Sequence, residues 1–303
     1  MRQSLAKILI LLPLLQSCER GEQPNLHGHL YFASSNYVGE LDLVKGTSVI
    51  VANRGAVTIH DISGFGDNRF LVAETAVVET REVPRISWVD IETGQSEILY
   101  SGVAARYLRE HSALVWDDGS RLHVTSRRRS SGINAQIMSH NLNQLSTIID
   151  VSDNMVLFET GISEQRAIHS YDVETRQLQR RETLSAACKL EGSVWIADRG
   201  QLACQARTQS GDGTEYLLTD LDGNVRGRLA LPPDGQFVAL AYAADQQVLI
   251  LTEPWRTVLG GGERFAVWAY DLMTGQSHRI LKNQYLGASA VYVDETLRDA
   301  TGQ

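Results

Sequence analysis

Residue types that act as catalysts or metal ligands are present in this sequence, but few of them have the spacing that such sites require. Its eight histidines are scattered, and only His27 and His29 have the short separation that zinc ligands often show. The three glycines at 260–262 are not followed by a lysine and have no strand-to-helix context, so they do not fit a phosphate-binding loop. We find no nucleophile motif either. The sequence therefore predicts no catalytic residue, no cofactor and no metal site.

The N-terminal segment has the parts of a secretory signal. Arg2 and Lys7 lie before or at the edge of an apolar run at 8–15, and the small residue Ser17 comes directly before Cys18. The run is far shorter than the roughly 20 residues that a membrane-spanning helix needs. We therefore expect three parts: a signal peptide that is removed (1–17), a tether (18–27) and one domain (28–303).

The four residues at 15–18, Leu-Gln-Ser-Cys, resemble the lipobox of bacterial lipoproteins, although Gln16 is an unusual residue at its position. The resemblance implies that Cys18 is acylated and becomes the new N-terminus, with lipid as the membrane anchor. Glu19 stands where an aspartate would retain an enterobacterial lipoprotein in the inner membrane, so the resemblance favours the outer membrane. The alternative is an ordinary signal peptide with an incidental cysteine.

Cys188 and Cys204 are the other two cysteines. In an exported, oxidising setting a single remaining pair normally forms a disulfide, and we expect one between these two residues. The alternative is two buried thiols.

The charge balance excludes some partners. The chain has 28 lysines and arginines against 36 aspartates and glutamates, and the signal peptide removes two of the bases. Such an acidic protein is unsuited to nucleic acid or to electrostatic adhesion on anionic lipid.

The fold follows from a repeated segment, an apolar strand that runs into a tight turn. Aspartate and asparagine accept hydrogen bonds from the turn backbone, and glycine supplies positive φ. The central residues are Asp42, Asp90, Asn141, Asp172, Asp220 and Asp271, spaced 48, 51, 31, 48 and 51 residues apart.

A second set of turns alternates with the first. Its aspartates are Asp67, Asp118, Asp153, Asp198 and Asp245, each followed by an apolar strand. Two hairpins per repeat make four strands in about 50 residues, which is the pattern of β-propeller blades. On this pattern Trp116 and Trp195 occupy matching places on inner strands.

The two ends of the chain complete the ring. Residues 287–294 have the pattern of an inner strand with no outer strands after it, and the segments at 29–35, 37–43 and 47–53 supply those strands. We predict an all-β, six-bladed propeller of four-stranded blades, closed by pairing of the N- and C-terminal strands. The interval of 31 residues before Asp172 predicts a shortened outer strand in the second blade or inner strand in the third. A five-bladed or irregular ring is the alternative.

The turn segments at 90–94 (DIETG) and 271–275 (DLMTG) resemble those of bacterial TolB-like, YVTN-type and WD40-like propeller repeats. The resemblance extends over nearly all of the chain after the signal. It implies the fold and little chemistry, because these repeats host many functions.

The loops that enter the inner strands are the expected ligand site, at the mouth of the central channel. They present a mixed polar ring, without the several carboxylates that a calcium-dependent lactonase would need. The candidate binding residues are Arg54, Arg106, Glu191, Asp234 and Tyr285.

Two functions fit these observations. One is a non-enzymatic, monomeric envelope lipoprotein whose propeller binds a protein or glycan partner. The other is a propeller hydrolase or lyase with its site in the central channel. A metal, or at least two convergent carboxylates in the channel, would favour the enzyme.

Overall fold

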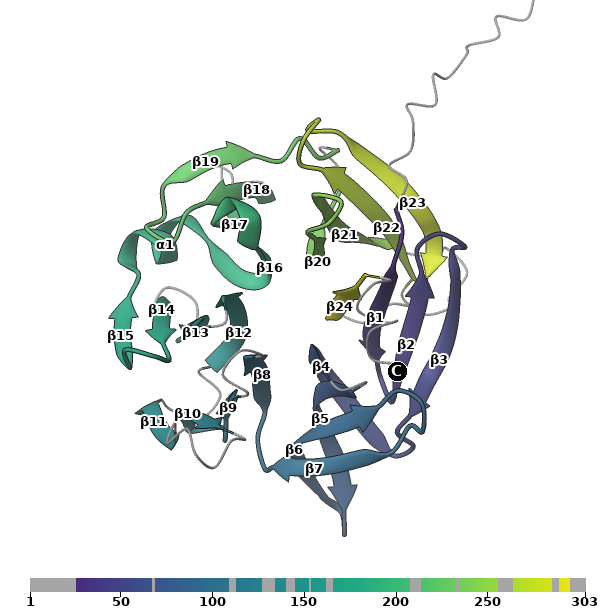
Figure 1. Ribbon diagram of the computed structural model, residues 1–303, viewed down its shortest axis with the longest axis vertical. Helices are drawn as coiled ribbons and strands as arrows, with labels where there is room; N and C mark the ends of the chain where they lie inside the picture. Colours follow the sequence, from purple (N-terminus) through teal and green to yellow (C-terminus); the bar gives the residue numbers. More distant parts are fainter. Residues whose placement is uncertain are drawn as a thin grey trace, which may run out of the picture.

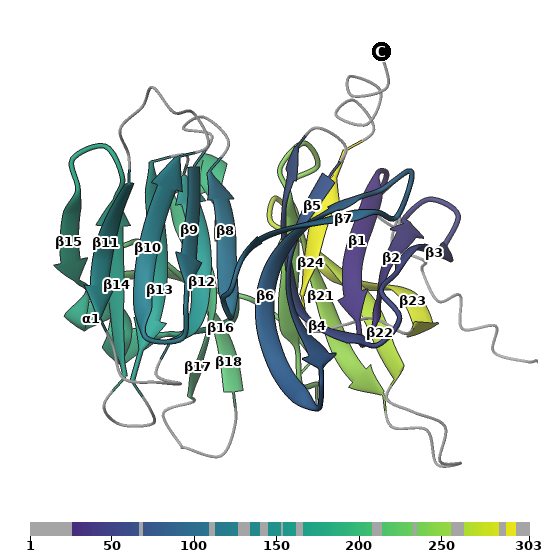
Figure 2. The same ribbon diagram turned by 90° about the horizontal axis from the view of Figure 1, so that it is seen from below.

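The computed structural model is a ring of six antiparallel sheets with four strands each (Figure 1). Figure 2 shows the ring from the side, with the strands crossing its thickness. The structure describes residues 26–66, 69–108, 113–126, 134–139, 145–152, 154–161, 166–207, 214–232, 235–255, 264–284 and 289–294.

Five blades use consecutive strands, and in each of them the first strand in the sequence is the innermost and the fourth is the outermost. The first has β4 (Val57–Gly66), β5 (Arg69–Val78), β6 (Arg81–Asp90) and β7 (Ser96–Tyr100). The second has β8 (Ala104–Leu108), β9 (Ala113–Asp117), β10 (Arg121–Ser126) and β11 (Asn134–Ser139). The third has β12 (Leu145–Ser152), β13 (Met155–Thr160), β14 (Ala167–Asp172) and β15 (Gln177–Arg180). The fourth has β16 (Lys189–Ile196), β17 (Gln201–Arg207), β18 (Thr214–Thr219) and β19 (Val225–Arg228), and the fifth has β20 (Val238–Ala243), β21 (Val248–Trp255), β22 (Arg264–Asp271) and β23 (Ser277–Gln284).

The sixth blade joins the two ends of the chain. Its strands are β24 (Ala290–Val293), β1 (His29–Ser34), β2 (Tyr37–Asp42) and β3 (Thr47–Asn53). β24 pairs with β1 in an antiparallel register that places Val293 opposite His29 and Ala290 opposite Phe32. This pairing closes the ring and confirms the predicted six-bladed propeller.

Apolar side chains hold neighbouring blades together. The middle strands are buried on both faces because each blade is covered by the blades beside it; Leu249, Ile250 and Leu251 on β21 are fully buried, for example. Between the sixth and first blades, the rings of Tyr31 and Phe70 lie with their centroids 4.6 Å apart. Burial of such a side chain stabilises the fold by about 1.5–3 kcal/mol.

The repeated turns behave as their sequences predict. Asp90 accepts hydrogen bonds from the backbone N–H groups of Glu92 (3.1 Å) and Thr93 (2.8 Å), and Gly94 follows with a φ of +66°. Asp271 repeats the arrangement before Gly275, whose φ is +71°. These turns join the third strand of a blade to its outer strand.

The second blade differs from the prediction. Asp118 lies in the turn between β9 and β10, which are the second and third strands of the blade rather than the first and second. The second and third blades therefore both keep all four strands despite the short interval of 31 residues. Asn141 lies outside the described residues. The error arose because aspartate and glycine favour a tight turn between any two strands.

The same shift separates the two tryptophans that we matched. Trp195 is on the inner strand β16, whereas Trp116 is on the second strand β9 and stacks between Tyr100 and His123 at 4.4 and 4.5 Å. The match between their positions was therefore wrong.

Helical structure is limited in the described residues. They contain one short helix, α1 (Glu182–Ala187), and one 3-10 turn (Ala197–Arg199), neither of which we predicted. Within the described ranges, none of the helices has the length and hydrophobicity to cross a bilayer.

Candidate binding channel

The innermost strands surround a cavity of about 510 Å³ at the centre of the ring. All six of these strands contribute to its wall. We call the rim where the inner strands begin the entry rim and the rim where they end the exit rim. The cavity reaches the exit rim, because its lining includes Ala197 and Ala244, which come directly after the ends of β16 and β20.

Aromatic and small side chains line most of the cavity. Tyr107, Trp195, Tyr242 and Tyr292 come from four different blades, and each is partly buried. Small residues open the space between them, as in the β20 sequence VALAYA and the β24 sequence AVYV. A cavity of this volume lies within the range of sites for small ligands or peptide side chains.

One ion pair crosses the wall of the channel. Arg106 on β8 donates from Nη1 to the Asp61 carboxylate on β4, and also to the carbonyl oxygen of Ala105 at 2.8 Å. Of the candidate residues that the structure describes, Arg106 is the one that lines the cavity.

Two tyrosines at the exit rim donate to carboxylates. The Tyr242 hydroxyl lies 2.6 Å from Asp198 Oδ1, and the Tyr292 hydroxyl lies 3.1 and 3.2 Å from the oxygens of Asp245. Burial raises the pKa of both phenols, and the neighbouring carboxylates raise the two pKa values further. Both tyrosines therefore remain neutral hydrogen-bond donors at physiological pH.

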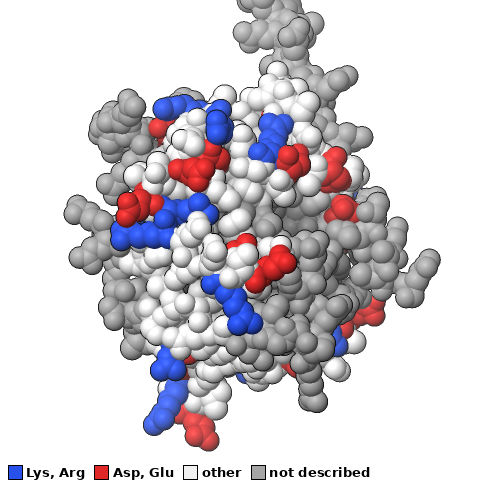
Figure 3. Space-filling model, turned by 60° about the vertical axis from the view of Figure 1, so that its left-hand side comes forward, with Lys and Arg blue, Asp and Glu red and all other residues white. Residues whose placement is uncertain are grey.

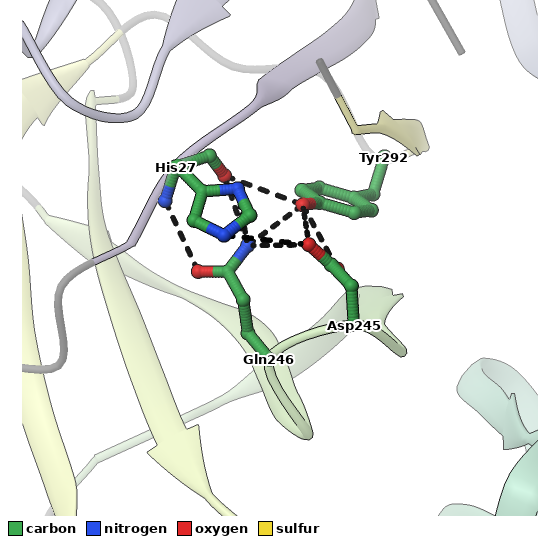
Figure 4. Close-up of polar contacts among 4 residues, drawn as sticks. All are labelled: His27, Asp245, Gln246 and Tyr292. Atoms are coloured by element: carbon green, nitrogen blue, oxygen red, sulfur yellow. Dashed lines mark hydrogen bonds and ion pairs between the residues drawn. The ribbon is translucent and has the colours of Figure 1, made fainter. Parts of the chain in front are cut away.

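The N-terminal end of the described chain is fastened to the same rim (Figure 4). Gln246 accepts a hydrogen bond from the backbone N–H of His27 at 3.0 Å and donates to the His27 carbonyl oxygen at 3.0 Å. It also donates to the Tyr292 hydroxyl at 2.7 Å. Leu26 is only 5% exposed and packs between the fifth and sixth blades. Leu26 and His27, which we assigned to the tether, thus pack against the domain.

Arg54 does not point freely into the channel mouth. Its guanidinium donates to the two oxygens of Glu74 at 3.0 and 2.8 Å, and the side chain is 9% exposed. Glu74 also accepts from Arg85 at 2.7 Å and from Ser87 at 3.0 Å. Burial opposes ionisation of Glu74, but the hydrogen bonds and charge of Arg54, helped by Ser87 and Arg85, outweigh it and lower the pKa of this carboxyl.

The other candidate residues are not brought together in the described structure. Glu191 is an exposed residue on β16 and does not line the cavity. Asp234 and Tyr285 lie outside the described residues, as does Cys18.

A repeated polar position on the second strands was missed by the sequence analysis. Glu159 accepts from the Leu190 N–H of the next blade at 2.8 Å, and Gln205 donates to the Phe237 carbonyl of the next blade at 2.8 Å. Glu74 occupies the same place in the first blade. For the two glutamates the signal was an apolar run followed by Glu-Thr, at 70–75 (FLVAET) and 156–160 (VLFET); Gln205 carries no such signal. Glu159 and Gln205 thus fasten neighbouring blades, whereas Glu74 binds Arg54 in the connection from the sixth blade and two side chains of its own blade.

The two cysteines lie within the fourth blade and are joined. The structure links Cys188, directly after α1, to Cys204 on β17, with a Cα–Cα distance of 5.6 Å. Both residues are buried among apolar side chains.

The histidine pair shows no common ligand point. His27 lies 3.5 Å from Asp245, whereas His29 Nδ1 lies 2.7 Å from Glu40. Across the described ranges, no group of three or more histidines, cysteines, aspartates and glutamates could hold a metal ion.

The outer surface carries both signs of charge side by side. Figure 3 shows basic and acidic side chains interspersed over the left-hand side of the ring in Figure 1. The exposed ion pairs of the protein include Arg226–Asp220 at 2.6 Å and Arg181–Asp222 at 3.4 Å. Such exposed pairs contribute little to stability and do not mark a site.

Comparison with known proteins supports the fold. No protein-family model and no curated protein matches the sequence. A chain from a nidogen–laminin complex has a TM-score of 0.62 at 13% identity, covering 87% of this chain and 97% of that chain. An oligogalacturonate lyase in complex with manganese has a TM-score of 0.50 at 12% identity, covering 78% and 73%. TolB from Acinetobacter baumannii has a TM-score of 0.41 at 15% identity, covering 85% and 53%. At such identities the first two matches show a likeness of fold alone, and the TolB match, with its lower TM-score, carries no further argument.

Proposed function

We propose that this protein is a non-enzymatic lipoprotein of the cell envelope, anchored in the outer membrane through Cys18, whose propeller binds a protein or glycan partner in its central channel. The observation that carries the proposal is the aromatic lining of the cavity. Its main polar groups are already paired, Arg106 with Asp61 and Tyr242 with Asp198. Rings and paired polar groups are suited to holding a ligand rather than to moving its protons.

The position of His27 limits how far the exit rim can lie from the proposed anchor. His27 is fastened at the exit rim, nine residues after Cys18. A segment of that length spans at most about 30 Å when extended. A lipid on Cys18 would therefore keep the exit rim within about 30 Å of the membrane surface and would leave that rim open to a partner.

Metabolic labelling with a fatty acid tests the anchor. The wild-type protein should incorporate the label and fractionate with outer membranes, and Cys18→Ala should lose both properties. Equal labelling of the variant would refute lipidation at this residue.

Affinity capture from envelopes tests the binding role. Ala244→Trp places a large side chain in the cavity without disturbing the packed core, because Ala244 lies at the exit rim, directly after the end of β20. Val44→Trp is the matched control, since Val44 is 63% exposed on an outer turn. The proposal expects a partner that is recovered by the wild type and by Val44→Trp and is lost from Ala244→Trp. Recovery of the same set by all three proteins would refute binding in the channel.

A further inference from the structure

We infer that the exit end of the channel binds a cationic side chain, a lysine or an arginine presented by a protein partner. This inference rests on the proposed function and names the class of partner for the same cavity. Its basis is the combination of aromatic walls with carboxylates at the mouth.

The aromatic walls provide the first half of the site. Trp195, Tyr242 and Tyr292 line the cavity from the fourth, fifth and sixth blades, next to one another around the ring. The face of an aromatic ring attracts a cation that lies within about 6 Å of its centroid, and the attraction is stronger away from water. The two tyrosines are held by their hydroxyl groups, through Asp198 and through Asp245 and Gln246, so their rings are positioned before a ligand arrives.

The carboxylates provide the second half. Asp198 and Asp245 stand on the hairpin turns that follow β16 and β20, where the channel opens. A carboxylate has about four acceptor positions, so a hydrogen bond from one phenol leaves capacity for a second donor. Asp198 is exposed, and the Asp245 side chain is 31% exposed, so both can be reached from the mouth.

The charges around the mouth favour a cation. Arg106 is neutralised by Asp61 on the neighbouring strand. His27 lies 3.5 Å from Asp245, and Arg199, next to Asp198 in sequence, donates to Gln247 at 3.1 Å. Because the partners of Arg199 are neutral groups, it keeps its charge, but the two carboxylates Asp198 and Asp245 exceed it by one. A cation that enters from the exit rim therefore meets net negative charge at the mouth and aromatic rings behind it.

A neutral glycan could also use both halves of the site, since sugar rings stack on aromatic side chains and sugar hydroxyls donate to carboxylates. It carries no charge, however, to compensate Asp198 and Asp245. Lysine and arginine supply an apolar stem for the rings and a cationic head with several donors for the carboxylates. The chemistry of the cavity thus points to a peptide segment.

A pair of peptides tests the inference by isothermal titration with the purified protein. One is a blocked heptapeptide with a single arginine among glycines and serines, and the other has citrulline, an uncharged isostere, in its place. We expect the arginine peptide to bind at least tenfold more tightly. Equal binding of the two peptides, or no measurable binding of either, would overturn the inference.

Charge-neutral variants test the two carboxylates. Asp198→Asn together with Asp245→Asn keeps an acceptor for each phenol, so the mouth should keep its shape, and the preference for arginine over citrulline should disappear. The matched control is Asp172→Asn with Asp222→Asn, which removes the same charge from the turns between the third and outer strands of the third and fourth blades. An equal loss of preference in the control would assign the effect to overall charge and reject the site. Unchanged melting temperatures show that the variants are folded.

The capture experiment separates this inference from the proposed function. If Ala244→Trp loses a partner that Asp198→Asn with Asp245→Asn retains, then binding in the channel stands and the cationic class is wrong. Recovery of a glycan in place of a protein would likewise leave binding in the channel standing and show that the cationic class is wrong. If Ala244→Trp loses nothing, the proposed function fails as well.

Discussion

Replacing Glu74 by alanine tests the buried ion cluster at the entry rim. The Glu74 side chain is 0% exposed, and it accepts hydrogen bonds from Arg54, Arg85 and Ser87 at 2.7–3.0 Å. Removal of the carboxylate leaves the Arg54 guanidinium, itself only 9% exposed, without its anion. Breaking a buried pair in this way costs about 3–5 kcal/mol.

Two further variants separate charge from hydrogen bonding. Glu74→Gln keeps an acceptor and loses the charge, so we expect a smaller cost of about 1–3 kcal/mol. Glu97→Ala is the control, because Glu97 is 59% exposed and pairs with Arg69 at 3.3 Å. An exposed pair of this kind contributes about 0–1 kcal/mol.

Urea unfolding followed by circular dichroism and tryptophan fluorescence measures these differences. Because such domains are stable by only about 5–15 kcal/mol, Glu74→Ala should shift the midpoint strongly. A loss for Glu74→Ala no larger than that for Glu97→Ala would refute the stabilising role of the cluster.

The remaining predictions concern the ring, the disulfide and acid stability. Deletion of 286–303 removes β24 and opens the sheet beside β1, so circular dichroism should show no cooperative melting, whereas deletion of 20–25 should leave the melting temperature unchanged. Alkylation and mass spectrometry of the non-reduced protein should find Cys188 and Cys204 joined, and reduction should cost about 3 kcal/mol for a loop of this size; two alkylated thiols would contradict this. Hydrogen bonds from Asn224 and Arg226 lower the pKa of Asp220 from 3.8 to about 2. The stability that the ionised Asp220 contributes is therefore present above roughly pH 4 and lost as the pH falls towards 2. Over that pH range the melting temperature of Asp220→Asn should fall less than that of the wild type.

The repeated turns were enough to predict the blades and their closure. An aspartate that accepts hydrogen bonds from the backbone of its own turn depends only on neighbouring residues, so Asp90 and Asp271 correctly predicted their hairpins. The same locality explains the error in the second blade. The turn at Asp118 carries no information on which two strands it joins, and this depends on the packing of β8 and β9 with the rest of the ring.

The candidate site was harder to predict because its contacts are not local. Arg54 and Arg106 both stand at or near the entry of an inner strand, yet Glu74 holds Arg54 away from the channel while Arg106 lines it. The partner of each arginine lies on another strand, so sequence position alone could not separate them. The aromatic lining could not be predicted either, since Tyr242 and Tyr292 are 50 residues apart in the sequence and come to the same cavity only when the ring closes.

Hydroxyl-radical footprinting tests the central claim most directly, by comparing the protein in intact envelopes with the purified protein. Trp195 and Tyr242 line the channel, whereas Ile98 is 58% exposed on the outer strand β7 of the first blade and serves as the internal reference. If a partner occupies the channel, oxidation of Trp195 and Tyr242 should fall severalfold in envelopes relative to that of Ile98. Equal oxidation of the channel residues in the two samples, with Ile98 unchanged, would contradict the account.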